Sequence, residues 1–181
     1  MRKFILGIIF LIFFGFLTYL SINKDMSCFN HDEPLLKVDS YPKNSVASRI
    51  SSPHPNGPIN SFSNSVVFGK GMAIQNVFPY PKTFMAINAF KEEAKAPYFL
   101  SIIVDENLQR RIETENFEFS ADQYLVSCGT ARHNVPVCAI IAQYDNYFID
   151  LYVHMYPDEM TYDDLRKVLH DMDNRMALCL E

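Results

Sequence analysis

The sequence contains no tryptophan, only six glycines and no C-x-x-C motif among its four cysteines. It also lacks the glycine-rich loops that bind phosphate and the G-x-S-x-G turn of many hydrolases. The formal net charge is −5, whereas a nucleic-acid binder needs a surplus of Lys and Arg to contact phosphates. These absences predict a protein without a zinc site, without a small-molecule cofactor and without a nucleic-acid partner.

One long apolar run stands near the start of the chain. Phe4–Ile22 carries no charged residue and, at about 1.5 Å per residue, is long enough to cross a bilayer core. Arg2 and Lys3 precede it and are expected to stay cytoplasmic. Cleavage as a signal peptide and lipidation of Cys28 remain as alternatives, although neither cleavage pattern is evident. We therefore expect residues 1–22 to be an uncleaved signal-anchor in the inner membrane.

The rest of the chain is expected to be extracytoplasmic, and periplasmic in a bacterium with two membranes. Residues 23–58 are rich in Pro, Ser and Asn and show no apolar period, so we expect a flexible tether. Residues 59–181 are long enough for one core. They contain ten Lys and Arg against seventeen Asp and Glu, a net charge of −7. The sequence thus predicts an acidic globular domain held by a tether.

Apolar and alternating segments in this domain predict mostly strands. The expected strands are Ser65–Phe68, Met72–Val77, Tyr98–Val104, Leu108–Phe119, Gln123–Cys128, Val135–Gln143 and Tyr147–Met155. Gly69–Gly71 suits a hairpin turn between the first two, and Asp145-Asn146 suits another turn. The pattern predicts an α+β fold, an antiparallel sheet of about five to seven strands with helices on one face. A transmembrane helix would precede it.

Two helices are expected. The first covers Thr83–Lys95, with an apolar stripe at Phe84, Ile87, Phe90 and Ala94. The second begins at Thr161, which forms a capping box with Asp164 three residues later. Its apolar positions follow at helical spacing: Leu165, Val168, Leu169, Met172, Met176 and Cys179. A two-sided helix of this kind is typical of one that lies on a sheet.

Three cysteines are candidates for a disulfide. If the hairpin turns at His133, Cys128 lies opposite Cys138, at a separation that a disulfide can bridge. Cys179, on the apolar side of the last helix, is an alternative partner for either. An oxidising compartment would favour a bond. A nucleophile and base made of Cys128 and His133 is another interpretation, but a turn histidine is usually only solvated.

A row of mixed chemistry runs along one predicted strand. Phe148, Asp150, Tyr152 and His154 alternate, so they share one face. Asp150 and His154 would be about 13 Å apart, too far to bind one metal ion. Aromatic side chains mixed with charge are typical of protein interfaces. We expect this row either to be a plain exposed face or to be the partner-binding surface.

Taken together, an anchor, a tether and an acidic domain without a catalytic motif are typical of a binding module. In outline this build is similar to that of immunity proteins against secreted antibacterial toxins, and of inhibitors of envelope enzymes. We expect a non-enzymatic protein that binds a basic protein partner stoichiometrically. The alternatives are an assembly or scaffold factor of an envelope machine and an envelope hydrolase whose site the sequence does not reveal.

Overall fold

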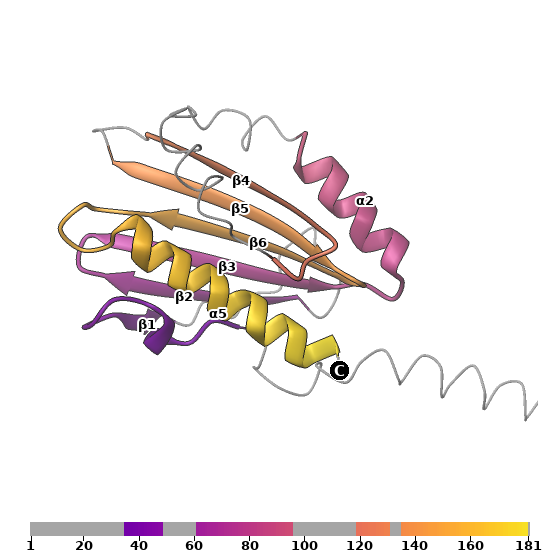
Figure 1. Cartoon of the computed structure of the whole chain (residues 1–181), viewed down its shortest axis with the longest axis horizontal. Helices are drawn as coiled ribbons and strands as arrows, with labels where there is room; N and C mark the ends of the chain where they lie inside the picture. Colours follow the sequence, from indigo (N-terminus) through magenta and orange to yellow (C-terminus); the bar gives the residue numbers. More distant parts are fainter. Residues whose placement is uncertain (1–34, 49–60, 96–118, 131–134, 181) are drawn as a thin grey trace, which may run out of the picture. The chain divides into compact units, whose positions relative to one another are not determined.

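The computed structural model describes residues 35–48, 61–95, 119–130 and 135–180. The chain divides into two compact units, Met1–Asp32 and Glu33–Glu181, and all described residues belong to the second. The described elements are η2 (Val38–Ser40), β1 (Val46–Ser48), β2 (Phe62–Phe68), β3 (Gly71–Pro79), α2 (Thr83–Glu93), β4 (Gln123–Thr130), β5 (Pro136–Tyr144), β6 (Tyr147–His154) and α5 (Tyr162–Leu180). The six strands form one antiparallel sheet in the order β1-β2-β3-β6-β5-β4 (Figure 1). The predicted antiparallel α+β architecture is confirmed.

A tight turn joins β2 to β3 at the predicted position. Gly69 has a φ of +59°, in the left-handed region that glycine adopts without strain. Glu159, from the segment before α5, fixes the turn from outside. Its Oε2 accepts hydrogen bonds from the backbone N–H of Lys70 at 2.6 Å and of Gly71 at 3.0 Å. A Cβ at position 69 would lie 2.1 Å from Glu159 Oε1, so a side chain there would have to displace the Glu159 carboxylate.

The last three strands form the predicted meander, and their register follows from the alternation of their side chains. The β4–β5 ladder pairs Cys128 with Cys138, as predicted, and the same register pairs Val126 with Ile140 and Tyr124 with Ala142. Asp145 in the β5–β6 turn has a φ of +46°. Asp122 supports this turn, because its Oδ2 accepts a hydrogen bond from the Asp145 backbone N–H at 2.7 Å. The turn chemistry and the pairing therefore agree.

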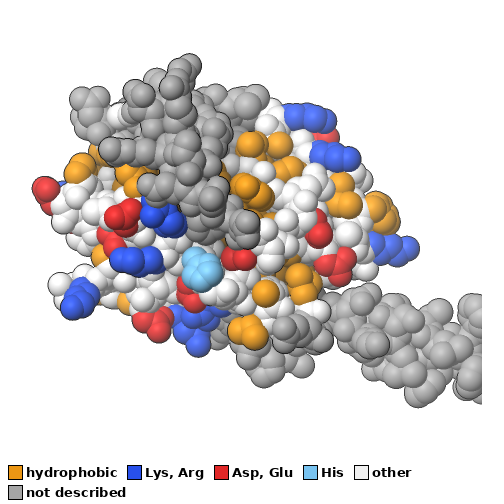
Figure 2. Space-filling model, viewed as in Figure 1, with side chains coloured by type: hydrophobic (Ala, Val, Ile, Leu, Met, Phe, Trp, Pro, Cys, Tyr) orange, Lys and Arg blue, Asp and Glu red, His pale blue; other side chains and the backbone are white. Residues whose placement is uncertain are grey.

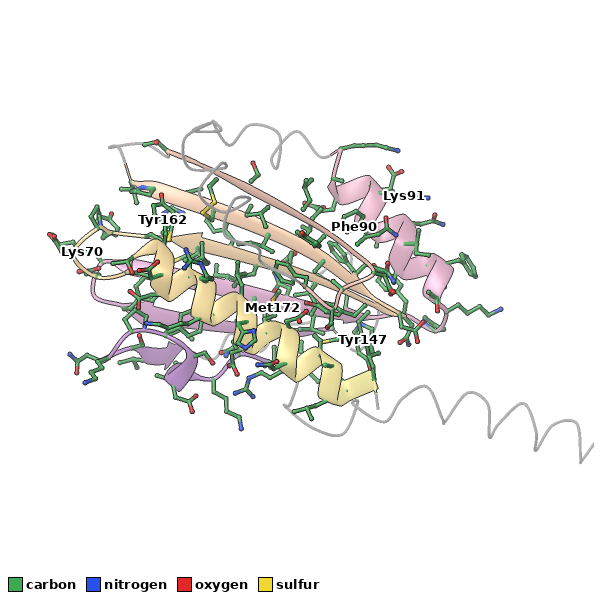
Figure 3. The ribbon with its side chains drawn as sticks, in the orientation of Figure 1. Lys70, Phe90, Lys91, Tyr147, Tyr162 and Met172 are labelled. Carbon is green, nitrogen blue, oxygen red and sulfur yellow. A yellow bond between two sulfur atoms is a disulfide. The ribbon has the colours of Figure 1, made fainter. Side chains whose placement is uncertain are left out.

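Helix α5 begins with the predicted capping box. Thr161 Oγ1 accepts a hydrogen bond from the Asp164 backbone N–H at 3.2 Å, and Asp164 Oδ2 accepts one from the Thr161 backbone N–H at 3.0 Å. Every predicted apolar position of this helix is buried. Met172, near the middle of α5 in Figure 3, is fully buried. Asp173 is buried too, which the sequence pattern did not suggest.

The two described helices cover opposite faces of the sheet, which corrects the expectation that helices share one face. The hydroxyl of Tyr144 donates a hydrogen bond to Asp173 of α5 at 3.0 Å. Ala86 of α2 instead packs in a cluster with Ile141 and Phe148, whose side chains point to the other side of the sheet. Phe78, Ile141 and Phe148 place apolar side chains on this second side as well, and they would stand in water if α5 were the only cover.

Helix α2 also turns a different side to the sheet than the sequence indicated. Phe84, the first residue of the expected inward stripe, is 58% exposed. The side chains that contact the sheet cluster are instead Ala86, Ala89, Phe90 and Ala94. Three of these four are alanines, which allow the helix backbone to approach the strands closely. Only Phe90 and Ala94 of the expected stripe face the sheet.

Part of the range expected to be a tether belongs to the folded unit. Strand β1 pairs with β2 at the edge of the sheet. Leu36 has no exposed surface, and its backbone N–H donates to the buried Gln75 Oε1 at 2.7 Å. Asn64 Nδ2 donates to the Leu36 carbonyl oxygen at 2.5 Å. Polar side chains of β2 and β3 therefore hold this segment against the α5 face.

Several expectations concern residues outside the described ranges. These are the membrane segment of residues 4–22, the strands expected at residues 98–104 and 108–118, the turn residue His133 and the lone Cys28. Among the described helices, none combines the length and the apolar character that crossing a membrane would need.

Candidate functional site

The predicted row on β6 shares one face, as expected, but α2 covers its first residue. The intervening residues fill the α5 face and are at most 1% exposed: Ile149, Leu151 and Val153. Phe148 is 5% exposed and stacks on Phe78 with ring centroids 5.7 Å apart. The expectation of an outward-facing row is therefore wrong for Phe148, which packs beneath the helix. Asp150, Tyr152 and His154 are each only partly accessible.

Asp150 is a half-buried carboxylate next to α2. Asn76 Nδ2, from the adjacent strand β3, donates a hydrogen bond to its Oδ1 at 2.6 Å. Burial raises the pKa of Asp150 to about 6, and the nearby Glu93 of α2 adds to the rise, while the hydrogen bonds from Asn76 oppose it. Asp150 is thus an acid that the fold holds closer to neutrality than an ordinary aspartate.

Tyr152 and His154 form a pair at the end of β6. Tyr152 Oη and His154 Nε2 are 2.8 Å apart and their rings meet edge to face, with centroids at 4.8 Å. Burial lowers the pKa of His154, so its neutral form is favoured. Asp150 lies four residues before His154, about 13 Å away along the strand. The row therefore has an acid at one end and a hydroxyl–imidazole pair at the other, and these do not converge on one atom.

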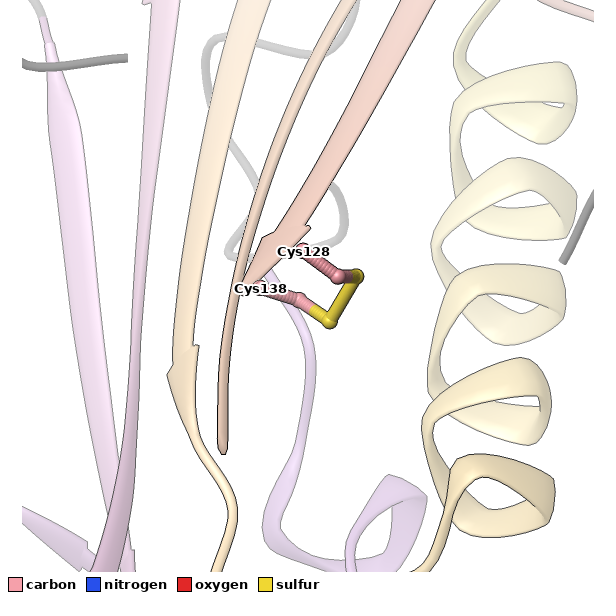
Figure 4. Close-up of a disulfide and its surroundings, with 2 residues drawn as sticks. All are labelled: Cys128 and Cys138. Carbon is pink, nitrogen blue, oxygen red and sulfur yellow. A yellow bond between two sulfur atoms is a disulfide. The ribbon is translucent and has the colours of Figure 1, made fainter. Parts of the chain in front are cut away.

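A disulfide links β4 to β5, as predicted. The Cys128 and Cys138 sulfurs are 2.03 Å apart, and the bond lies on the side of the sheet that faces α5 (Figure 4). Neither cysteine is then a thiol nucleophile. Cys179 is disulfide-bonded as well, and no described cysteine is free. The alternative pairing of Cys179 with either strand cysteine is wrong, because these two are bonded to each other.

A charged groove lies between η2 and the outer side of α5, and no pattern in the sequence indicates it. It has a volume of about 510 Å³. Its charged lining comes from both segments: Asp39, Lys43, Asp164, Lys167, Asp171 and Arg175. Ser40 and Tyr41 complete the η2 side. In Figure 2, which views the molecule from the same side as Figure 1, Lys and Arg side chains lie among Asp and Glu on the surface.

The charges of the groove are partly matched within it. Asp171 accepts hydrogen bonds from Ser40 Oγ and, at 2.8 Å, from Arg175 Nε. Partial burial opposes ionisation of Asp171, but these bonds outweigh it and lower its pKa. Lys167 Nζ forms an ion pair with Asp164 Oδ1 at 3.4 Å. Lys43 is exposed at the rim. The groove therefore carries charges of both signs, some of which are paired with each other.

The groove could not be found from sequence because its two walls are far apart along the chain. Tyr41 is 8% exposed and stacks on Phe68 with ring centroids at 6.0 Å. Burial, reinforced by the charge of Asp171, raises the pKa of the Tyr41 hydroxyl. This aromatic anchor holds η2 in place, yet a lone tyrosine in a polar, proline-containing segment gave no periodic signal.

No group of three or more His, Cys, Asp or Glu side chains in the described ranges is arranged to hold a metal ion. His170 and Asn174 are exposed on α5, whereas Asp173 points inward. Comparison with known proteins found no matching family model, no matching curated protein and no matching solved structure.

Proposed function

We propose that this protein is a membrane-tethered extracytoplasmic binding protein of the immunity or inhibitor type. It would neutralise a secreted antibacterial toxin or an envelope enzyme by forming a stoichiometric complex. Residues 4–22 would anchor it in the inner membrane, with Arg2 and Lys3 on the cytoplasmic side. The proposal is independent of any family resemblance and depends on the chemistry of the surface.

The groove between η2 and α5 is the observation that carries the proposal. It is open, it is lined by charges of both signs, and its volume of about 510 Å³ suits a loop of a partner protein. Arg175, which lines the groove, belongs to a residue type that interfaces favour. By contrast, the Asp150 carboxylate lies about 13 Å along the strand from His154, which pairs with Tyr152, so the polar groups of this row do not converge on one atom.

The acidic character of the chain supports a basic partner. Residues 59–181 have ten basic against seventeen acidic side chains, a net charge of −7. The electrostatic attraction from this net charge raises the association rate with a basic protein more than it raises the affinity of the final complex. Association should therefore slow as the ionic strength rises above about 0.1 M, where the Debye length falls below about 10 Å. Dissociation should change less.

Affinity capture with a matched pair of variants tests the proposal. The full chain, solubilised in mild detergent, is used as bait for envelope and secreted proteins. Asp39→Lys reverses an exposed acidic charge of the groove lining, whereas Glu92→Lys reverses an exposed acidic charge on α2, on the other face of the sheet. Because the proposed partner is basic, we expect Glu92→Lys to retain it and Asp39→Lys to lose it.

Titration of the captured partner then separates binding from catalysis. A one-to-one endpoint, with inhibition proportional to the amount of this protein, is the expected result. Equal capture by both variants would remove the groove from the proposal. Conversion of many partner molecules by each copy would indicate a hydrolase instead, and would direct attention back to Asp150, Tyr152 and His154.

A further inference from the structure

Among the strands in the described part of the chain, β4 is the last on one side of the sheet. It follows β5 in the strand order, while the opposite edge is β1, which has three residues (Figure 1). A short strand such as β1 offers little backbone for pairing. β4 has eight residues. Natural proteins normally protect a strand of that length with charges, proline or a bulge.

No such protection is present in the sequence of β4. Gln123–Thr130 reads QYLVSCGT, without Lys, Arg, Asp, Glu or Pro. The nearest acid, Asp122, turns away from the edge, because its Oδ2 accepts hydrogen bonds from Asp145 N and, at 3.1 Å, from Gln143 Nε2. The strand is therefore uncharged along its whole length.

The first half of β4 is also accessible and apolar. Tyr124 is 47% exposed and Leu125 is 37% exposed, and the two point to opposite faces because they are neighbours in a strand. Phe119 extends the apolar surface, with its ring centroid 4.6 Å from that of Tyr124. Further along, Ser127 and Cys128 are buried. The region available to a partner is thus Gln123–Val126.

The disulfide makes this edge a rigid template. Cys128 is bonded to Cys138 on β5, so β4 cannot slip in register or separate from the sheet. A pairing strand would therefore meet an edge that has already lost its conformational freedom, which lowers the entropic cost of association. A free edge on a mobile strand would not have this property.

We propose that β4 pairs with β4 of a second copy of this chain, which would join the two sheets across a two-fold axis. The chain has a net charge of −5, so two copies repel each other except where their contact surfaces carry no charge. Gln123–Val126 is such a surface, and self-pairing places no like charges opposite one another. An antiparallel pair of identical strands is isologous and closes as a dimer. A basic partner, by contrast, would gain nothing from a neutral edge.

The test compares single lysine substitutions in the full chain, solubilised in detergent. Leu125→Lys places a charge on the edge twice per dimer, and Leu178→Lys changes an equally apolar side chain, 69% exposed, on α5. Sedimentation over a range of concentrations should show a monomer–dimer equilibrium for the unaltered chain. Leu125→Lys should weaken it by roughly tenfold or more, and Leu178→Lys should leave it unchanged.

Tyr124→Lys, at a second exposed position of the strand, guards against an effect specific to position 125. Retention of the Cys128–Cys138 bond in each variant shows that β4 and β5 remain paired. Hydrogen exchange gives a direct readout, because the Gln123–Val126 amides should become protected as the concentration rises. A monomer at every concentration would overturn the proposal. So would a dimer that both edge variants leave intact, since it would form elsewhere. Either result would leave the groove proposal standing.

Discussion

Replacing Asp150 with asparagine should stabilise the protein at neutral pH. The carboxylate is half-buried beside α2 and its pKa is raised to about 6, first by burial and then by Glu93. In the unfolded chain its pKa is 3.8. A folded pKa above the unfolded one means that the fold prefers the neutral acid. Its contribution to stability is fully present below pH 3.8 and is lost as pH rises through about 6.

The size of the effect follows from the difference between the two pKa values. About two pH units at 1.36 kcal/mol each correspond to roughly 2–3 kcal/mol at pH 7. Asparagine keeps the shape of the side chain and an oxygen to accept the bond from Asn76, but it carries no charge. Asp150→Asn should therefore match the unaltered protein near pH 4 and exceed its unfolding free energy by roughly 2–3 kcal/mol near pH 7.

Urea unfolding of the full chain in a non-ionic detergent measures this difference between pH 4 and pH 7. Circular dichroism of the tyrosines follows the transition, because the sequence has no tryptophan. Glu93→Gln should give a smaller gain by removing the charge that disfavours ionised Asp150. Glu92→Gln is its control, since Glu92 is exposed and pairs with Lys95 at 3.4 Å. A gain for Asp150→Asn that is the same at both pH values, or a loss at pH 7, would refute the reasoning.

Three further results are expected. Replacing both Cys128 and Cys138 with serine should lower the unfolding free energy by roughly 2–3 kcal/mol, because the bond closes a short loop; an unchanged denaturation midpoint would contradict this. Asp164→Ala should cost about 1 kcal/mol at pH 7 by removing the helix cap. Partial burial opposes the shift, but the bonds to this carboxylate lower its pKa, so the loss should disappear in acid. The Gly69→Ala variant should unfold at a lower urea concentration than the unaltered protein. Adding Glu159→Ala should restore only the stability lost to the steric clash, because the strain of alanine at a positive φ would remain.

Local rules were sufficient wherever the partners are close in sequence. The β4–β5 register could be counted from the hairpin, and the capping box is a four-residue pattern. The buried positions of α5 follow from helical spacing alone, because a strong apolar stripe leaves one side to bury. Asp173 is the exception, since its burial depends on Tyr144 and Ser120, which lie far away along the chain.

The sequence was misleading where two distant segments share the burial of one surface. On β6 the row of Asp150, Tyr152 and His154 has the polarity of an exposed face, yet α2 packs over its start at Phe148. The apolar stripe predicted for α2 consists mostly of large side chains, whereas the helix contacts the sheet mainly through alanines. The sequence of β6 or of α2 alone does not reveal that the two are in contact, because each apolar pattern is also compatible with one side exposed to water.

Residues 35–48 also depend on distant partners for their position, and this affects which fragment can be used to test binding. The apolar residues of this segment follow no helix or strand period, and its place is set in part by single bonds to distant side chains, such as Leu36 to Gln75 and Ser40 to Asp171. It supplies one wall of the groove and an edge strand of the sheet. A soluble fragment that begins at residue 59 would therefore lack both, and would expose the edge of β2. Binding measured on such a fragment would test the sheet and α5 but not the groove. A fragment must begin at or before Glu33, the start of the compact unit, for the absence of binding to count against the proposed function.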